Sequence, residues 1–117
     1  MLTLSSVMIG TSQIDTLASF YEKVFERKAD MMEEGWHGWR IGSSFFSIGQ
    51  HSEVHGMAKD PSRIIFNFET KEVKSEFDRI KDLGATVIKE PYEMGGGMIA
   101  TFADPDGNYF QLMTPWE

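Results

Sequence analysis

Histidines are the side chains of this sequence best suited to hold a metal ion or to move a proton. Two of them flank an acidic residue in the run HSEVH, residues 51–55. Histidines four positions apart bind zinc when a helix presents both rings on one face. This run has no helical period and Gly56 follows it, so we predict a solvated loop. His37 is a candidate acid or base, but the spacing gives it no nucleophile or carboxylate partner, and we predict an edge or cleft-wall residue.

The composition excludes several classes of protein. Of 117 residues, 11 are Lys or Arg and 18 are Asp or Glu, so the formal net charge is −7. Nucleic acids and anionic membrane surfaces attract basic faces, and we expect this chain to bind neither. The chain has no cysteine, which excludes disulfides, thiolate metal sites and cysteine nucleophiles. We expect one cytoplasmic, globular domain with a hydrophobic core.

The elements that must position these side chains follow from hydrophobic periodicity. Residues 3–9 read as a strand, and Ser12 is placed to cap a helix whose apolar residues recur with helical spacing up to Phe25. Three short strands, residues 28–33, 36–41 and 45–48, are separated by glycines. A linker without periodicity occupies residues 51–62.

The same order of elements then returns. Residues 63–69 alternate as a strand, Val73 to Leu83 form a second amphipathic helix closed by Gly84, and strands follow at 85–90, 98–103 and 108–113. The run 104–107, DPDG, is typical of a tight turn. We therefore predict a duplicated βαβββ unit, with module one at 1–50 and module two at 63–117.

Three short runs resemble the vicinal oxygen chelate superfamily, which includes glyoxalase I, extradiol dioxygenases and bleomycin-binding proteins. They are FYEKVF at 20–25, IKDLGA at 80–85 and DPDGN at 104–108. The resemblance implies an α+β fold in which two βαβββ modules form a curved, barrel-like eight-stranded sheet around a ligand cleft. It also implies a homodimer.

The resemblance further implies four positions for metal ligands, and here they hold Ser6, Ser47, Arg63 and Gln111. Hydroxyl groups are weak ligands at neutral pH, and a guanidinium has no lone pair to offer. Only Gln111 has a suitable oxygen, and no negative charge remains to balance a divalent cation. We therefore expect no bound metal and no cofactor.

Alternation along the strands selects the residues of the cleft. It places Asn67 with Arg63, and Tyr109 with Gln111, on faces opposite the core. Arg63 is a candidate bidentate clamp for a carboxylate or phosphate, unless it lies at the strand start and faces solvent. The expected polar contacts are Arg63, Asn67, Tyr109, Gln111, Ser6 and Ser47. The expected apolar wall consists of Trp39, Phe45 and Met98.

Three functions remain open because this fold hosts several chemistries. The first is a metal-free, glyoxalase/bleomycin-resistance-like protein that binds a small organic molecule. The second is a metal-dependent lyase or dioxygenase of the same superfamily. The third is a non-catalytic interaction module with a vestigial cleft. The catalytic residues, if any, and the ligand's identity do not follow from the sequence.

Overall fold

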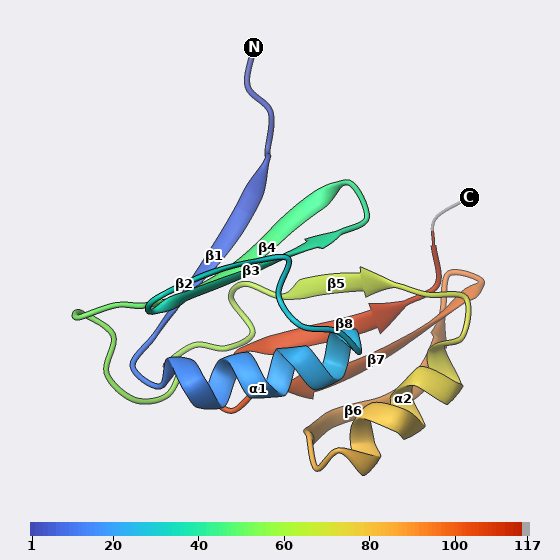
Figure 1. The fold of residues 1–117 in the computed structure, drawn as a ribbon. Coiled ribbons are helices and arrows are strands. Elements are labelled where there is room, and N and C mark those ends of the chain that lie inside the picture. The colour runs from blue at the N-terminus through green and yellow to red at the C-terminus, as the bar shows by residue number, and fades with distance from the viewer. Residues whose placement is uncertain (116–117) are drawn as a thin grey trace. The chain divides into compact units, whose positions relative to one another are not determined.

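A computed structural model describes residues 1–115, so the last two residues of the predicted second module lie outside the described residues. The chain divides into two compact units, Met1–Gly56 and a second unit that begins at Met57. Each unit contains one helix and four strands in the order βαβββ (Figure 1). The duplication predicted from hydrophobic periodicity is thus present in the structure.

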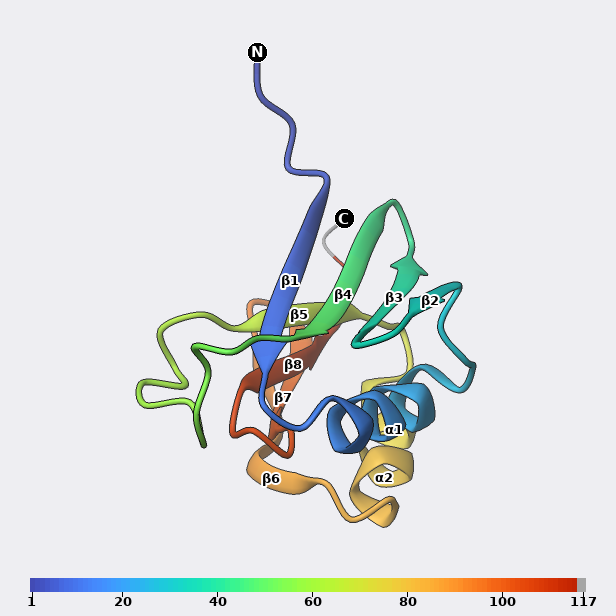
Figure 2. The same ribbon diagram turned by 60° about the vertical axis from the view of Figure 1, so that its left-hand side comes forward.

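The first unit consists of β1 Ser6–Thr11, α1 Ile14–Phe25, β2 Met31–Glu33, β3 Trp36–Ile41 and β4 Ser44–Gln50. Its sheet has the order β1-β4-β3-β2, which Figure 2 shows as neighbouring ribbons. Strand β1 runs parallel to β4, and the other pairs are antiparallel. Helix α1 packs against this sheet through β4.

The second unit consists of β5 Phe66–Glu69, α2 Val73–Asp82, β6 Thr86–Met94, β7 Gly97–Ala103 and β8 Tyr109–Met113. Its sheet order, β5-β8-β7-β6, repeats that of the first unit element by element. The α+β fold class is therefore confirmed, with the eight strands divided between two four-stranded sheets. Strand β6 extends beyond the predicted Glu90 to Met94, and the glycines Gly95 and Gly96 make the turn into β7 with positive φ angles.

Each unit has its own aromatic core. In the first, Tyr21 of α1 is fully buried, and its ring centroid lies 4.9 Å from that of Phe46 on β4. In the second, Phe77 of α2 stacks on Phe102 of β7 at 5.0 Å, and Phe102 stacks on Phe110 of β8 at 5.6 Å. Because aromatic rings bury large apolar areas, these ring contacts show which face of each sheet the helix covers.

The start of α1 differs from the expectation. The sequence predicted Ser12 as the capping residue, but the helix begins after Gln13 without a side-chain cap from its own N-cap residue. Instead, Thr11 Oγ1 accepts the N–H of Gln13 at 3.0 Å, and Gln50 Oε1 accepts the N–H of Ile14 at 3.2 Å. Gln50 lies at the end of β4, 36 residues further along the chain, so local sequence gives no signal of this contact.

Two predicted turns are confirmed. Gly84 follows α2 with φ of 92°, a conformation that favours glycine. In the DPDG hairpin, the buried carboxylate of Asp104 accepts the N–H groups of Asp106 at 2.9 Å and Asn108 at 3.0 Å. None of the helices among residues 1–115 has the length and apolar character to cross a membrane.

Candidate functional site

Each sheet has one face turned away from its helix, which we call its open face. In the first unit the rings of Trp39 and Phe46 contact Phe25 of α1, with centroids 5.4 and 5.5 Å apart, so they mark the helix face. Strand alternation places Phe45 and Ser47 on the open face, as predicted. Residues paired across the strands share a face. The open face therefore contains Ser6, Met8, Met31, Trp36, Gly38, Arg40, Phe45 and Ser47.

The hydroxyl of Ser47 already has a structural role. Its Oγ donates to the backbone carbonyl of Val7 at 3.3 Å, and the residue is only 4% exposed. Ser6 is exposed at the start of β1 and is paired with Phe45 on the same face. Both serines lie where the sequence placed them, but Ser47 has little surface to offer a ligand.

Trp39 does not form part of an apolar wall on the open face, and that expectation was wrong. Trp39 pairs with Phe46 across the strands and is 0% exposed. Its indole N–H donates to the carbonyl of Arg27, the second residue after α1, at 3.0 Å. The side chain thus joins the end of α1 to β3.

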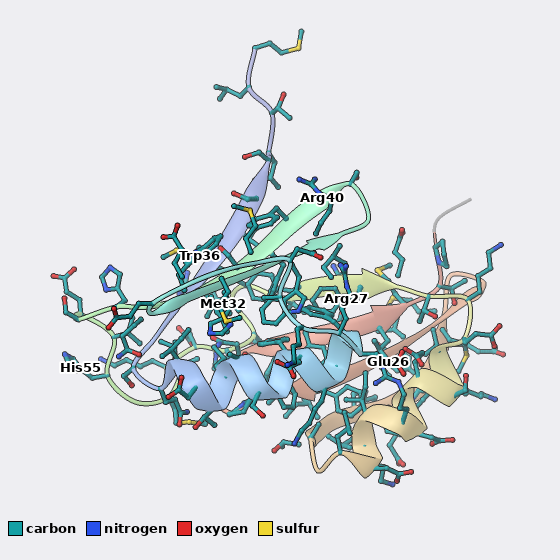
Figure 3. The ribbon with its side chains drawn as sticks, in the orientation of Figure 1. Glu26, Arg27, Met32, Trp36, Arg40 and His55 are labelled. Atoms are coloured by element: carbon teal, nitrogen blue, oxygen red, sulfur yellow. The ribbon has the colours of Figure 1, made fainter. Side chains whose placement is uncertain are left out.

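Trp36 is the aromatic residue of β3 that does lie on the open face (Figure 3). Its ring stacks on that of Phe45 at 5.9 Å with an interplanar angle of 26°. Gly38 lies on the same face, and a Cβ atom there would come within 2.9 Å of the Trp36 ring. Gly38, two residues after Trp36, is the signal that could have identified the Trp36–Phe45 pair. A glycine in a strand often marks a place where rings approach the backbone too closely for a side chain.

In the second unit, four polar residues form one row across the open face of the sheet. Asn67 of β5 pairs with Gln111 of β8, Gln111 with Thr101 of β7, and Thr101 with Lys89 of β6. We call these four residues the polar row. The amide Nε2 of Gln111 donates to Thr101 Oγ1 at 3.1 Å. Aromatic residues occupy the opposite face, against α2.

Asn67 and Gln111 therefore share a face, as alternation predicted, and half-buried Tyr109 lies on that face beside Ala103. Sequence reasoning missed Lys89. Its ammonium group lies 5.4 Å from the ring centroid of Tyr92, close enough for a cation–π contact. The strand pairing shifts register on both sides of Lys89, so period-two alternation could not assign its face.

Arg63 does not lie on β5, so its predicted place on the strand beside Asn67 is wrong. The strand begins at Phe66, three residues later. The N–H of Arg63 donates to the Asp60 carbonyl at 3.0 Å, and its guanidinium lies 3.4 Å from the Asp60 carboxylate. The side chain is 76% exposed, so it occupies a turn that faces solvent.

Met98 also does not match its predicted place. On β7, Met98 lies on the same face of the sheet as the buried residues Ala100 and Phe102, and Ile99 and Thr101 lie on the other face. The ring of Phe102 packs on α2, so Met98 lies on the helix side of the sheet and not on the open face.

The four positions implied for metal ligands fit a metal poorly. Arg63 is cationic and solvent-facing, the Ser47 hydroxyl donates to a carbonyl, and Ser6 is a neutral hydroxyl. Gln111 retains one amide oxygen. Residues 1–115 hold no group of three or more His, Cys, Asp or Glu side chains arranged for a metal.

The histidine run forms a turn. His51 Nδ1 accepts the N–H of Glu53 at 3.2 Å, and the His51 carbonyl accepts the N–H of Val54 at 3.1 Å. The segment has no helical conformation, so it does not present two rings on one helix face. On β3, His37 stacks against Trp39 on the helix face at 6.3 Å and is half-buried.

Comparison with known proteins assigns this geometry to a family. The sequence model of the Glyoxalase/Bleomycin resistance protein/Dioxygenase superfamily matches residues 3–112. A curated relative, the metallothiol transferase FosB of Bacillus licheniformis, is 24% identical over 116 residues, which cover 97% of this chain and 75% of FosB.

Solved structures show the same fold. A glyoxalase/bleomycin resistance protein/dioxygenase family enzyme from Burkholderia phytofirmans PsJN is 25% identical, with a TM-score of 0.78, over 97% of this chain and 98% of that one. A glyoxalase-related enzyme from Fulvimarina pelagi has a TM-score of 0.80 at 14% identity, over 98% of this chain and 89% of that one.

Proposed function

The chain belongs to the Glyoxalase/Bleomycin resistance protein/Dioxygenase superfamily, and from that premise we propose that it binds a small organic molecule on the open face of the second sheet. The ligand is held by hydrogen bonds and without a metal ion. The polar row is the observation that carries this proposal. It aligns two amides, a hydroxyl and an ammonium group across three strand pairs.

The chemistry of the polar row defines what it recognises. Gln111 donates through Nε2 to Thr101, which leaves Oε1 of Gln111 as an acceptor. Lys89 supplies the positive charge of the row, and Asn67 is exposed with one donor and one acceptor group. Half-buried Tyr109 and Met113 add apolar surface on the same face. The row favours a ligand with hydrogen-bonding groups and an acidic or electron-rich end.

The proposal of metal-free binding rests on the donor set. A divalent cation in a protein is held mainly by carboxylate, imidazole or thiolate groups, and neutral amide oxygens only supplement them. The polar row contributes no carboxylate, imidazole or thiolate, and its Lys89 repels a cation. A hydrogen-bonded organic ligand needs none of those three groups.

A thermal-shift screen tests this function. The full chain is heated with aromatic compounds, antibiotics and thiol conjugates, each with and without EDTA. We expect at least one class to raise the melting temperature equally in both conditions, because a ligand that binds only the native state stabilises it. Absence of any shift would favour the non-catalytic interaction module.

Variants then locate the binding site of a compound found in the screen. Lys89→Gln and Gln111→Leu should each weaken binding by about tenfold, as measured by calorimetry. Lys74→Gln is the matched control, because Lys74 is exposed on α2 and carries the same charge. Equal affinity of all three variants and the parent chain would remove the polar row from the site.

A metal-dependent lyase, dioxygenase or transferase is the second candidate function. The relative FosB is a metallothiol transferase by name, and it matches nearly the whole of this chain. This candidate requires that the stabilising compound act only when a divalent cation is added. A thermal shift that EDTA abolishes would therefore support it against metal-free binding.

A homodimer and a cytoplasmic location complete the proposal. The first is supported by the resemblance to the superfamily, and the second is compatible with a chain that has no cysteine and so needs no disulfide. Light scattering coupled to size exclusion measures the mass directly. A mass of one chain at micromolar concentration would contradict the dimer.

A further inference from the structure

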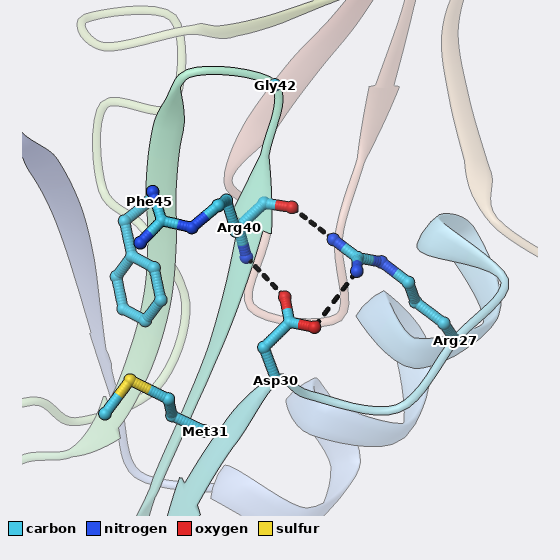
Figure 4. A pocket seen from close by; sticks show the side chains of 6 residues that line it. All are labelled: Arg27, Asp30, Met31, Arg40, Gly42 and Phe45. Carbon is cyan, nitrogen blue, oxygen red and sulfur yellow. Dashed lines mark hydrogen bonds and ion pairs between the residues drawn. The ribbon is translucent and has the colours of Figure 1, made fainter.

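A pocket in the first unit has no part in the polar row. It has a volume of about 520 Å³ and lies between the segment after α1 and the β3–β4 hairpin (Figure 4). Two arginines and one aspartate make its lining net positive by one charge. The residues that line it are Arg27, Asp30, Met31, Arg40, Gly42 and Phe45.

Asp30 holds the frame of the pocket. One of its carboxylate oxygens accepts Arg27 Nη1 at 3.0 Å, and the other accepts the backbone N–H of Arg40 at 2.7 Å. Arg27 Nη2 donates in addition to the carbonyl of Arg40. Both oxygens of Asp30 are therefore engaged. A guanidinium has five N–H groups, so Arg27 retains donors that these bonds do not use.

The guanidinium of Arg40 is the available charge of the pocket. Within residues 1–115 it has no carboxylate at ion-pair distance. Its central carbon lies 5.9 Å from the ring centroid of Phe45, and the side chain is exposed (Figure 4). A guanidinium beside an aromatic ring offers a bidentate edge to an anion while its flat face remains on the ring.

The apolar residues that line the pocket determine which uncharged part of a ligand fits there. Phe45 contributes a ring, and Met31, which is 57% exposed on β2, contributes a flexible thioether that adapts to flat groups. The net charge of −7 does not forbid an anion here, because charges beyond about 8 Å are largely screened at physiological salt. A local positive pocket can therefore operate on an acidic protein.

We propose that this pocket binds a small aromatic carboxylate. Its carboxylate pairs with the guanidinium of Arg40, and its ring packs against Phe45 and Met31. The site goes beyond the proposed function, because none of its residues belongs to the polar row or to the second unit.

Benzoate is the probe, added to the ¹⁵N-labelled full chain and followed by amide chemical shifts. We expect saturable shifts confined to the pocket segments 27–31 and 40–45. Benzyl alcohol, which lacks the charge, and acetate, which lacks the ring, should each bind at least about tenfold more weakly. Shifts that do not saturate, or that centre on Asn67, Lys89 and Gln111, would overturn the assignment.

Variants separate the contribution of the Arg40 charge to benzoate binding from that of the Phe45 ring. Arg40→Gln should weaken benzoate binding by about tenfold, and Phe45→Leu should weaken benzoate but leave acetate unchanged. Arg63→Gln is the matched control, since it removes the same charge from a solvent-facing turn. If Arg40→Gln loses the dispersed spectrum of a folded chain, Arg40→Lys replaces it, with charge kept and bidentate geometry lost. Unchanged benzoate affinity in a folded Arg40 variant would refute the proposal.

Discussion

The carboxylate of Asp30 accepts the backbone N–H of Arg40 at 2.7 Å, and through this bond the segment after α1 is tied to β3. The same carboxylate holds the guanidinium of Arg27 at 3.0 Å. Arg27 in turn accepts the indole N–H of Trp39 through its carbonyl. The side chain of Asp30 therefore connects the end of α1 to strand β3 and to the wall of the pocket.

Asp30→Ala should lower the free energy of unfolding by about 1 kcal/mol. The substitution removes the acceptor of one backbone N–H and of one guanidinium, and water replaces them because Asp30 is partly exposed. Urea denaturation measures the change. Asp60→Ala is the control, since its ion pair with Arg63 is exposed on both sides and surface pairs of this kind contribute little. Equal losses in both variants would contradict this role of Asp30.

Gly38→Ala should destabilise the first unit by about 1–3 kcal/mol. A Cβ atom at this position would collide with the ring of Phe45 and lie 2.9 Å from Trp36. Thermal or urea unfolding measures the effect. At Gly49 the nearest atom is 3.3 Å away, so Gly49→Ala should cost less. Adding Phe45→Leu to Gly38→Ala should recover part of the loss. If the double variant loses more free energy of unfolding than the two single variants lose together, a ring collision is excluded as the cause.

Asp104→Ala should cost about 2–3 kcal/mol, more than Asp30→Ala. The carboxylate is only 4% exposed and accepts the N–H groups of buried Asp106 and partly buried Asn108, which the substitution leaves without that acceptor. Amide hydrogen exchange provides a local readout. We expect faster exchange at Asn108 than in the parent chain, and unchanged exchange there would argue against the carboxylate as the organiser of the hairpin.

The pH dependence of stability should have a component from Glu76 on α2. A hydrogen bond from Arg79 holds the pKa of Glu76 below its usual value of 4.5. A carboxyl whose pKa is lower in the folded state stabilises it above the unfolded pKa, and that contribution disappears as the pH falls through the folded pKa. Unfolding experiments between pH 6 and pH 2 are compared for the parent chain and Glu76→Gln. The variant should show the smaller loss of stability on acidification, and parallel curves would refute the linkage.

Alternation along a strand made part of the candidate site predictable. Phe45 and Ser47, and likewise Asn67 and Gln111, share faces because side chains two apart point the same way in any extended chain. For Phe45 and Ser47 a single strand suffices, whereas the shared face of Asn67 and Gln111 also requires the pairing of β5 with β8. The duplication could also be predicted from the sequence, because each unit has one segment of helical periodicity between segments that alternate as strands.

The missed features depend on contacts between distant segments. The faces of Trp39 and Trp36 are fixed by hairpin register, which pairs them with Phe46 and Gly49 on the next strand. Lys89 follows a register shift that its own sequence does not reveal. Arg63 continues the alternating pattern of β5, but its bonds to Asp60 draw it into the preceding turn.

The metal content of the purified chain decides whether this member of the superfamily binds its ligand without a metal ion. The full chain is purified without chelators and analysed by elemental mass spectrometry. We expect zinc, nickel, manganese and iron all to be far below one ion per chain, because the available side chains form a poor ligand set. A stoichiometric amount of any one of these metals, retained through purification, would contradict it.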